Sequence, residues 1–169
     1  GVHLQQSMSG NQFVGIGRPM ILVETSGVTV TDNEFFACGG TVTPASAASV
    51  EVVNASSIVA LMGCSSYRVS RNTFVNCLRP VCISLDNGLI TTSKPCDSGQ
   101  VMENITRGSG ALLSSHGAER LTVANNNYVG LANDYHGVYI EGGLETIVHN
   151  NKISCGGGNG VSVVGSSLC

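Results

Sequence analysis

The stretch VTVTDNEF, residues 28–35, decides the fold of this chain. Apolar and polar residues alternate in it up to an Asn, and a Phe follows two positions after that Asn. Strict alternation is typical of a half-buried β-strand, whose successive side chains point to opposite faces. Asn tolerates left-handed backbone angles, so we expect this residue to turn the chain from one strand into the next.

The same pattern occurs six times, and an Asn is the position that all copies share. These residues are Asn11, Asn33, Asn72, Asn104, Asn126 and Asn151. An apolar residue stands three positions before each Asn, and a large apolar residue stands two positions after it, except at Thr106. Successive Asn residues are 22, 39, 32, 22 and 25 positions apart. The short spacings suit one coil of a three-sided β-helix, and the longer ones suit a coil with an inserted loop.

The repeat therefore predicts an all-β fold, a right-handed parallel β-helix of about six to seven coils with inserted loops. We expect a single domain over residues 1–169, which either stands alone or is part of a longer solenoid or fibre. The Asn carboxamides should hydrogen-bond from coil to coil at the strand spacing of about 4.8 Å. Phe35 should stack on Phe74 inside the coils, and Tyr128 on Ile153. An ordinary β-sandwich with Asn-rich turns is the alternative, and six coincident copies of the pattern count against it.

A third strand is expected in each coil, after the turn that follows the large apolar residue. The predicted strands are residues 21–24, 50–53, 83–86, 112–115, 138–141 and 161–164. Alternation places one set of their side chains in the core. These inward residues are Ile21, Val23, Val50, Val52, Ile83, Leu85, Leu112, Val138, Ile140, Val161 and Val163. Insertions are expected at about residues 39–48, 55–65 and 88–98.

Composition limits the classes of function. The formal net charge is −3 and only 11% of residues are charged, so no basic surface indicates nucleic acid. No apolar run approaches the ~20 residues that a membrane span needs. The seven cysteines are typical of a secreted or extracellular protein. None of them has zinc-site spacing with His, and we expect neither a metal nor another cofactor.

Two pairs of cysteines are candidates for disulfides. We expect Cys64 to pair with Cys96 and to join the second and third insertions. Cys38 and Cys77 each lie five residues after a repeated Asn, so they should stack on adjacent coils at a separation that permits a bond. A stack of buried thiols is equally open for this second pair, and Cys77 with Cys82 is a further option.

Two sequons occur, at Asn54 and Asn104. Asn104 belongs to the repeat and should be buried, whereas Asn54 ends an outer strand. We therefore expect any glycosylation at Asn54.

The repeat resembles the right-handed parallel β-helix superfamily of pectate lyases, polygalacturonases and phage tailspikes. Residues 155–165, CGGGNGVSVVG, are similar to the CGxGHGxSxG stretch of polygalacturonases, with Asn159 where that family has its His. The paired Asp of that family is absent, since Tyr135 and His136 fall near its place. The resemblance implies the fold and a substrate-binding sheet made of the third strands, but fold alone does not give function.

Outward positions of the third strands hold the candidate site. We expect Asp86, His116 and Glu141 on neighbouring coils of one face as candidate catalytic residues. Asp86 and Glu141 should lie about 9–10 Å apart, near the upper limit for the carboxyl pair of an inverting glycosidase. A His between two carboxylates can act as acid or base. The candidate substrate-binding residues are Glu51, Ser84, Tyr139 and His136, with Tyr139 as a stacking platform.

Two functions remain open at this point. The first is an extracellular module that binds an acidic or neutral polysaccharide and, if it is an enzyme, cleaves it as a hydrolase or lyase. The second is a structural building block of a fibre, adhesin stalk or surface assembly. An uncapped solenoid exposes unpaired strand edges, which invite end-to-end contact with another copy. The polar outer residues would then have no role beyond keeping the surface soluble.

Overall fold

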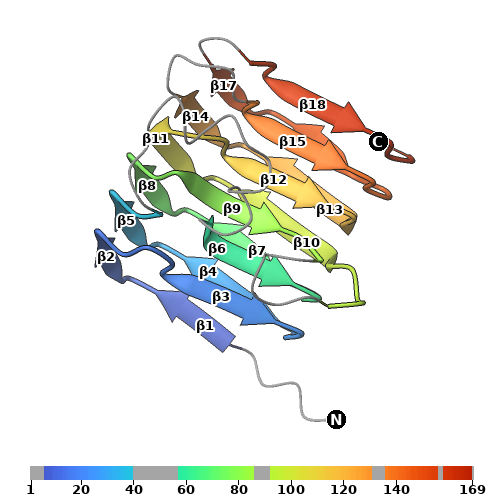
Figure 1. Ribbon diagram of the computed structural model, residues 1–169, viewed down its shortest axis with the longest axis horizontal. Helices are drawn as coiled ribbons and strands as arrows, with labels where there is room; N and C mark the ends of the chain where they lie inside the picture. Colours follow the sequence, from blue (N-terminus) through green and yellow to red (C-terminus); the bar gives the residue numbers. More distant parts are fainter. Residues whose placement is uncertain (1–5, 40–56, 86–91, 131–135, 156–157, 169) are drawn as a thin grey trace.

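The computed structural model describes residues 6–39, 57–85, 92–130, 136–155 and 158–168. These residues form three parallel sheets of six strands each (Figure 1). Every coil gives one strand to each sheet, and six coils stack with the N-terminal and C-terminal coils at opposite ends. The predicted parallel β-helix is thereby confirmed.

We call the three sheets A, B and C. Sheet A contains β1 (Gln6–Ser9), β4 (Val28–Thr31), β7 (Arg68–Ser70), β10 (Asp97–Met102), β13 (Glu119–Ala124) and β16 (Ile147–His149). Sheet B contains β2 (Gln12–Val14), β5 (Glu34–Phe36), β8 (Thr73–Val75), β11 (Ile105–Ser109), β14 (Asn127–Gly130) and β17 (Lys152–Ser154). Sheet C contains β3 (Met20–Val23), β6 (Ser57–Met62), β9 (Arg79–Ile83), β12 (Leu113–His116), β15 (Val138–Glu141) and β18 (Val161–Val164).

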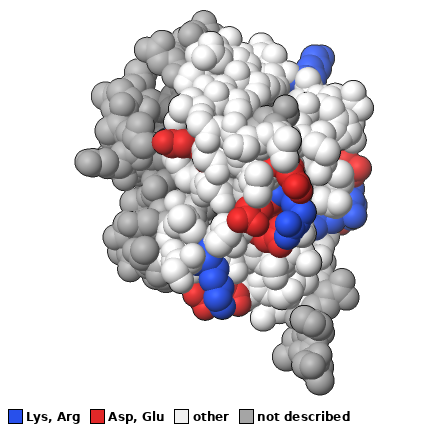
Figure 2. Space-filling model, turned by 90° about the vertical axis from the view of Figure 1, so that its right-hand side faces the viewer, with Lys and Arg blue, Asp and Glu red and all other residues white. Residues whose placement is uncertain are grey.

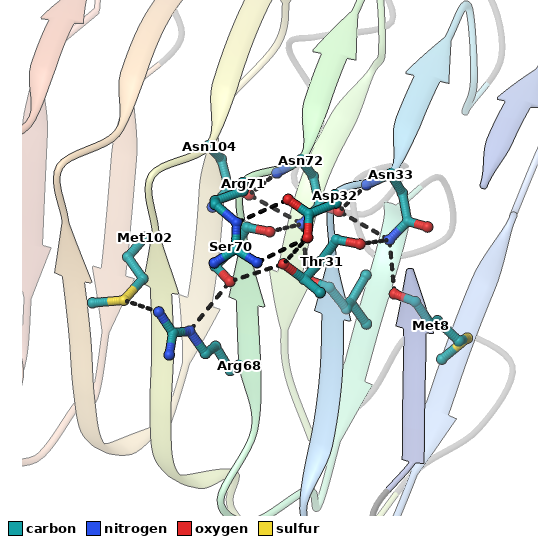
Figure 3. Close-up of polar contacts among 11 residues, drawn as sticks. Met8, Thr31, Asp32, Asn33, Arg68, Ser70, Arg71, Asn72, Met102 and Asn104 are labelled. Atoms are coloured by element: carbon teal, nitrogen blue, oxygen red, sulfur yellow. Dashed lines mark hydrogen bonds and ion pairs between the residues drawn. The ribbon is translucent and has the colours of Figure 1, made fainter. Parts of the chain in front are cut away.

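The predicted Asn ladder holds the corner between sheets A and B (Figure 3). From Asn33 onward, the Oδ1 of each ladder Asn accepts hydrogen bonds from the backbone N–H and the Nδ2 of the Asn one coil before it, at 2.9–3.1 Å. Nδ2 also donates to a carbonyl of the preceding coil, as Asn72 does to Val30 at 2.9 Å. Asn33, Asn72, Asn104 and Asn126 are at most 1% exposed, so the ladder satisfies polar groups that water cannot reach.

The bend at this corner falls one residue earlier than predicted. The residue before each ladder Asn has the left-handed conformation, with φ of 57° at Asp32, 54° at Arg71 and 59° at Glu103. Arg71 also pairs with Asp32 of the preceding coil at 2.8 Å (Figure 3). The Asn therefore satisfies the turn with its side chain and does not make the turn with its backbone.

Small side chains act in the same way at the other two corners. The Cys64 N–H donates to the Cys96 sulfur at 3.3 Å, and the Cys77 N–H donates to the Ser109 hydroxyl at 3.0 Å. The described cysteines are free thiols: Cys38, Cys64, Cys77, Cys82, Cys96 and Cys155. The predicted Cys64–Cys96 and Cys38–Cys77 disulfides are therefore not formed in the structure. Cys64 and Cys96 belong to the buried core and do not join two surface loops.

The interior of sheet B is an aromatic stack. The rings of Phe13 and Phe35 lie 4.9 Å apart, and those of Phe35 and Phe74 are also 4.9 Å apart, with interplanar angles of 7° and 6°. Thr106 takes the next place, and Tyr128 and Ile153 continue in register. The predicted stack is present, with its predicted interruption.

Sheet C departs from the prediction in its second coil. The strand there is β6, whereas the predicted strand at residues 50–53, with Val50, Glu51 and Val52, lies outside the described residues. Residues 57–62 were expected in an insertion and instead form a fully buried strand. A continuous apolar run such as SIVALM does not show the alternation that marks a half-exposed strand.

Sheet C is also shifted by one residue in its first coil. Met20 and Leu22 face the interior, in register with inward residues of β6, and the predicted Ile21 and Val23 are half-buried on the other face. The sequence MILV is apolar throughout, so its pattern does not fix the register. Leu85, also predicted inward, lies beyond the end of β9 and is 38% exposed.

The same shift occurs in β12. Leu113 and Ser115 point inward, in register with Val138 and Ile140, and Ser114 and His116 therefore point outward. The prediction had placed Leu113 and Ser115 on the outer face. Leu112, predicted inward, is buried in the core just before this strand. Two Leu followed by two Ser do not distinguish the two registers.

The ladder makes a prediction about stability. Asn72→Ala should lower the free energy of unfolding by about 2–4 kcal/mol, because it leaves buried polar groups of two neighbouring coils without partners. Urea denaturation measures the change. Asn11→Ala, at the exposed end of the ladder, is the matched control and should cost less than about 1 kcal/mol. Equal losses at the two positions would contradict the role assigned to the ladder.

Candidate functional site

The candidate site lies on the outer face of strands β12 and β15. Ser114 stands in register with Tyr139, and His116 with Glu141, one coil further. Because outward residues of stacked parallel strands are about 4.8 Å apart, these four side chains touch although 25 residues separate the two strands in sequence. We call Ser114, His116, Tyr139 and Glu141 the His116 cluster.

Hydrogen bonds run through the whole cluster. Nδ1 of His116 lies 3.0 Å from Oε2 of Glu141, and Nε2 of His116 lies 3.1 Å from the hydroxyl oxygen of Ser114. The Tyr139 hydroxyl donates to the same Glu141 oxygen at 3.2 Å. The carboxylate of Glu141 thus holds both a ring nitrogen and a phenol in place.

Aromatic contacts extend the cluster to His136. The rings of His136 and Tyr139 are stacked, with centroids 5.6 Å apart and an interplanar angle of 17°. His116 meets Tyr139 in a tilted arrangement at 5.7 Å. The backbone N–H of Asn159 donates to Nδ1 of His136 at 3.2 Å, which fixes the orientation of that ring.

Exposure differs within the cluster. The Glu141 side chain is 50% exposed and that of His116 is 21% exposed, whereas Ser114 is only 5% exposed. Burial and the neighbouring Glu141 carboxylate raise the pKa of Tyr139, since both disfavour a phenolate. The cluster is therefore half-buried, and its carboxylate, Glu141, is the side chain most exposed to solvent.

The part of sheet C that precedes the cluster has a different outer face. Ala60 of β6 and Cys82 of β9 are in register with each other, and Cys82 is in register with Ser114. Both outward residues are nearly inaccessible, at 3% and 1% exposed. Ser114 continues this inaccessible row at 5% exposed, so the cluster reaches solvent through His116 and Glu141.

The structure brings some of the predicted site residues together. His116, Glu141, Tyr139 and His136 are neighbours, as described above. Ser84 lies just after the end of β9 and is only 6% exposed, and its role as a sugar contact stays a prediction. The remaining predicted residues lie outside the described residues: Asp86, Glu51 and the glycosylation candidate Asn54.

Ser114 is the cluster residue that the sequence pattern missed, because β12 was placed one residue out of register. A signal for the correct register exists in the sequence. Gly63, Gly117, Gly142 and Gly165 each follow a strand of sheet C directly, and all have positive φ. Aligning the chain on these glycines places His116 beside Glu141 and Ser114 beside Tyr139.

Charges elsewhere form small mixed groups. On the face shown in Figure 2, acidic and basic side chains lie next to one another and leave much of the surface uncharged. Arg120 pairs with Asp97, and Lys94 lies 3.8 Å from Glu24. Within the part of the chain that the structure describes, no three His, Cys, Asp or Glu side chains gather in a metal-binding arrangement.

No protein-family model, curated protein or solved structure matches this chain. Among the described residues there is no helix long and apolar enough to cross a membrane. The function must therefore be argued from the site itself.

The hydrogen bond between Tyr139 and Glu141 can be tested by titration. Glu141→Gln should lower the pKa of Tyr139 towards its ordinary value, because the neutral amide no longer repels the phenolate; burial keeps part of the shift. The ¹³Cζ resonance of Tyr139 measures this pKa. Glu34→Gln, on sheet B, should leave it unchanged, and an equal effect of both substitutions would rule out the contact.

Proposed function

We propose that this chain is an extracellular, pectin-lyase-like β-helix module that binds polysaccharide on the outer face of sheet C. The observation that supports it is the stacked pair of His136 and Tyr139 beside the half-exposed Glu141. Aromatic rings pack against the apolar faces of sugar rings, and carboxylate oxygens accept hydrogen bonds from sugar hydroxyls.

The stacking of coils also favours a polymeric ligand. Equivalent outward positions recur at each coil, so successive sugar units can meet successive strands. Tyr139 is followed one coil later by Ser162, and Glu141 by Val164. The polar contacts are thus concentrated at β12 and β15, and a chain that crosses sheet C would be held most tightly there.

Cleavage of the polysaccharide is the catalytic form of this proposal. In this form His116, whose Nδ1 lies 3.0 Å from Glu141, acts as acid or base, and Asp86 and Glu141 are the two carboxylates. A hydrolase or lyase would use them at a glycosidic bond.

Binding can be tested with a panel of neutral and acidic polysaccharides. Tyr139→Ala should weaken binding about tenfold or more, because an aromatic contact contributes ~0.5–1.5 kcal/mol beyond its buried area and 1.4 kcal/mol is tenfold in affinity. Isothermal titration calorimetry measures the change. Glu34→Gln on sheet B should bind like the unchanged chain. If the unchanged chain binds no polysaccharide in the panel, the proposal fails.

A second candidate function is end-to-end assembly into a fibre or stalk, and the ends of the Asn ladder favour it. No described residue donates to Oδ1 of Asn11, and none accepts from the backbone N–H of Asn151. One end thus offers an acceptor and the other a donor. Val161 and Val163 occupy inward positions of the last coil and remain 41% and 46% exposed. A second copy stacked head to tail would cover them.

Sedimentation velocity over a range of concentrations tests this assembly. The chain should associate as its concentration rises, and Val163→Asp should abolish association by placing a charge in the contact. Val129→Asp, at an outward position of sheet B with 45% exposure, should associate like the unchanged chain. A monomer at all concentrations would exclude this function.

A further inference from the structure

We propose that Ser114 is a nucleophile that removes acyl groups esterified to the hydroxyls of the bound polysaccharide, with His116 as its base. The inference rests on the proposed function for the identity of the ester's carrier. Its structural basis is the continuous chain from the Ser114 hydroxyl through both nitrogens of His116 to Glu141. This order of Ser, His and carboxylate is the one that activates a serine for acyl transfer.

The direction of the hydrogen bonds follows from the partners. A carboxylate oxygen only accepts, so Nδ1 of His116 carries the proton that faces Glu141. In the neutral ring Nε2 then holds a lone pair, and the hydroxyl of Ser114 donates to it. Ser114 is thereby aligned to lose its proton to Nε2. Tyr139 donates to the same carboxylate and further restrains it.

The reaction is balanced with water as its only co-reactant. The Ser114 oxygen bonds to the acyl carbon while its proton passes to Nε2 of His116. The bond from the acyl carbon to the sugar oxygen then breaks, and that oxygen leaves with the proton from Nε2. Water next loses a proton to Nε2 and attacks the acyl-serine, which releases a carboxylic acid and restores the Ser114 hydroxyl.

Glu141 has a positioning role in this scheme. It holds His116 in one tautomer and stabilises the imidazolium that forms during each step. His136 supplies a neutral donor on the same face, because its Nδ1 accepts from Asn159 and its proton therefore sits on Nε2.

The placement of Ser114 separates this site from an ordinary surface hydrogen bond. Ser114 is 5% exposed while its partners His116 and Glu141 reach solvent, so the hydroxyl is shielded and its base is accessible. Shielding protects an acyl-enzyme and strengthens the electrostatic interactions around it. It also favours a short acyl group, such as acetyl, over a bulky one.

Covalent labelling with a fluorophosphonate probe tests the nucleophile directly. We expect one probe per folded chain, attached to Ser114 in the peptide map, together with hydrolysis of p-nitrophenyl acetate. Ser114→Ala should abolish both, with circular dichroism to show that it folds. Ser115→Ala is the matched control, because its side chain points into the core from the same strand, and it should keep both activities.

With p-nitrophenyl acetate as substrate, Glu141→Gln should lower kcat by about 100-fold with little change in KM. This substrate has no sugar hydroxyls for Glu141 to bind, so the carboxylate acts on it only through His116. A fall in thermal stability with unchanged kcat would instead assign Glu141 a structural role only and would overturn the scheme.

The outcomes distinguish this inference from the proposed function. If the chain binds polysaccharide but the probe does not label Ser114, the nucleophile is excluded and the binding function stands. If Ser114 is labelled and p-nitrophenyl acetate is hydrolysed without any polysaccharide binding, the polysaccharide ester is excluded as substrate. Release of acetate from an acetylated polysaccharide by the unchanged chain, and not by Ser114→Ala, supports both.

Discussion

The hydrogen bond that a backbone N–H donates to the Asn side-chain oxygen of the next coil is the constraint on which this structure depends. A chain that turns three times per coil must bend at corners where the backbone cannot pair within a sheet. Buried N–H groups at such corners cost free energy unless a side chain accepts from them. The ladder from Asn11 to Asn151 supplies these acceptors at one corner, and Cys96 and Ser109 do so at the others. Because each acceptor belongs to the next coil, satisfying the corner also fixes the vertical register.

Register in turn creates the candidate site. Ser114 and His116 come from one strand, and Glu141 comes from the next coil, 25 residues beyond His116 in sequence. The ladder and the Phe stack fix how each coil is aligned on the next. Outward side chains of β12 and β15 therefore lie side by side at the strand spacing. A slip of one residue would turn Ser114 and His116 into the core and remove the cluster entirely. Stability and chemistry thus depend on the same coil-to-coil alignment.

Sequence alone predicted the features that repeat and failed where the pattern is uniform. Asn33, Asn72 and Phe35, Phe74 recur at fixed offsets in polar and apolar contexts, so their stacking could be derived. β3 is apolar along its length, β6 is apolar after Ser57, and Leu112 and Leu113 stand together at the start of β12. In such segments alternation carries no information about which side chains face the core. His116 and Glu141 were expected on neighbouring coils of one face, but their register was not predicted. Both precede a glycine with positive φ, and that signal would have supplied it. Ser114 was missed because it lies in β12, where the sequence pattern does not show which side chains face the core.

The coil that carries Ser114 and His116 has two hydroxyl side chains at positions that other coils fill with apolar residues. Thr106 breaks the aromatic stack of sheet B there, and Ser115 stands between Ile83 and Ile140 in sheet C. Both hydroxyls are buried without a hydrogen-bond partner among the described residues, and each costs about 1–3 kcal/mol. Apolar residues of similar size would relieve this cost. Natural proteins usually depart from the rules of packing where function requires it, so these two buried hydroxyls are further reason to look for chemistry on the outer face of this coil.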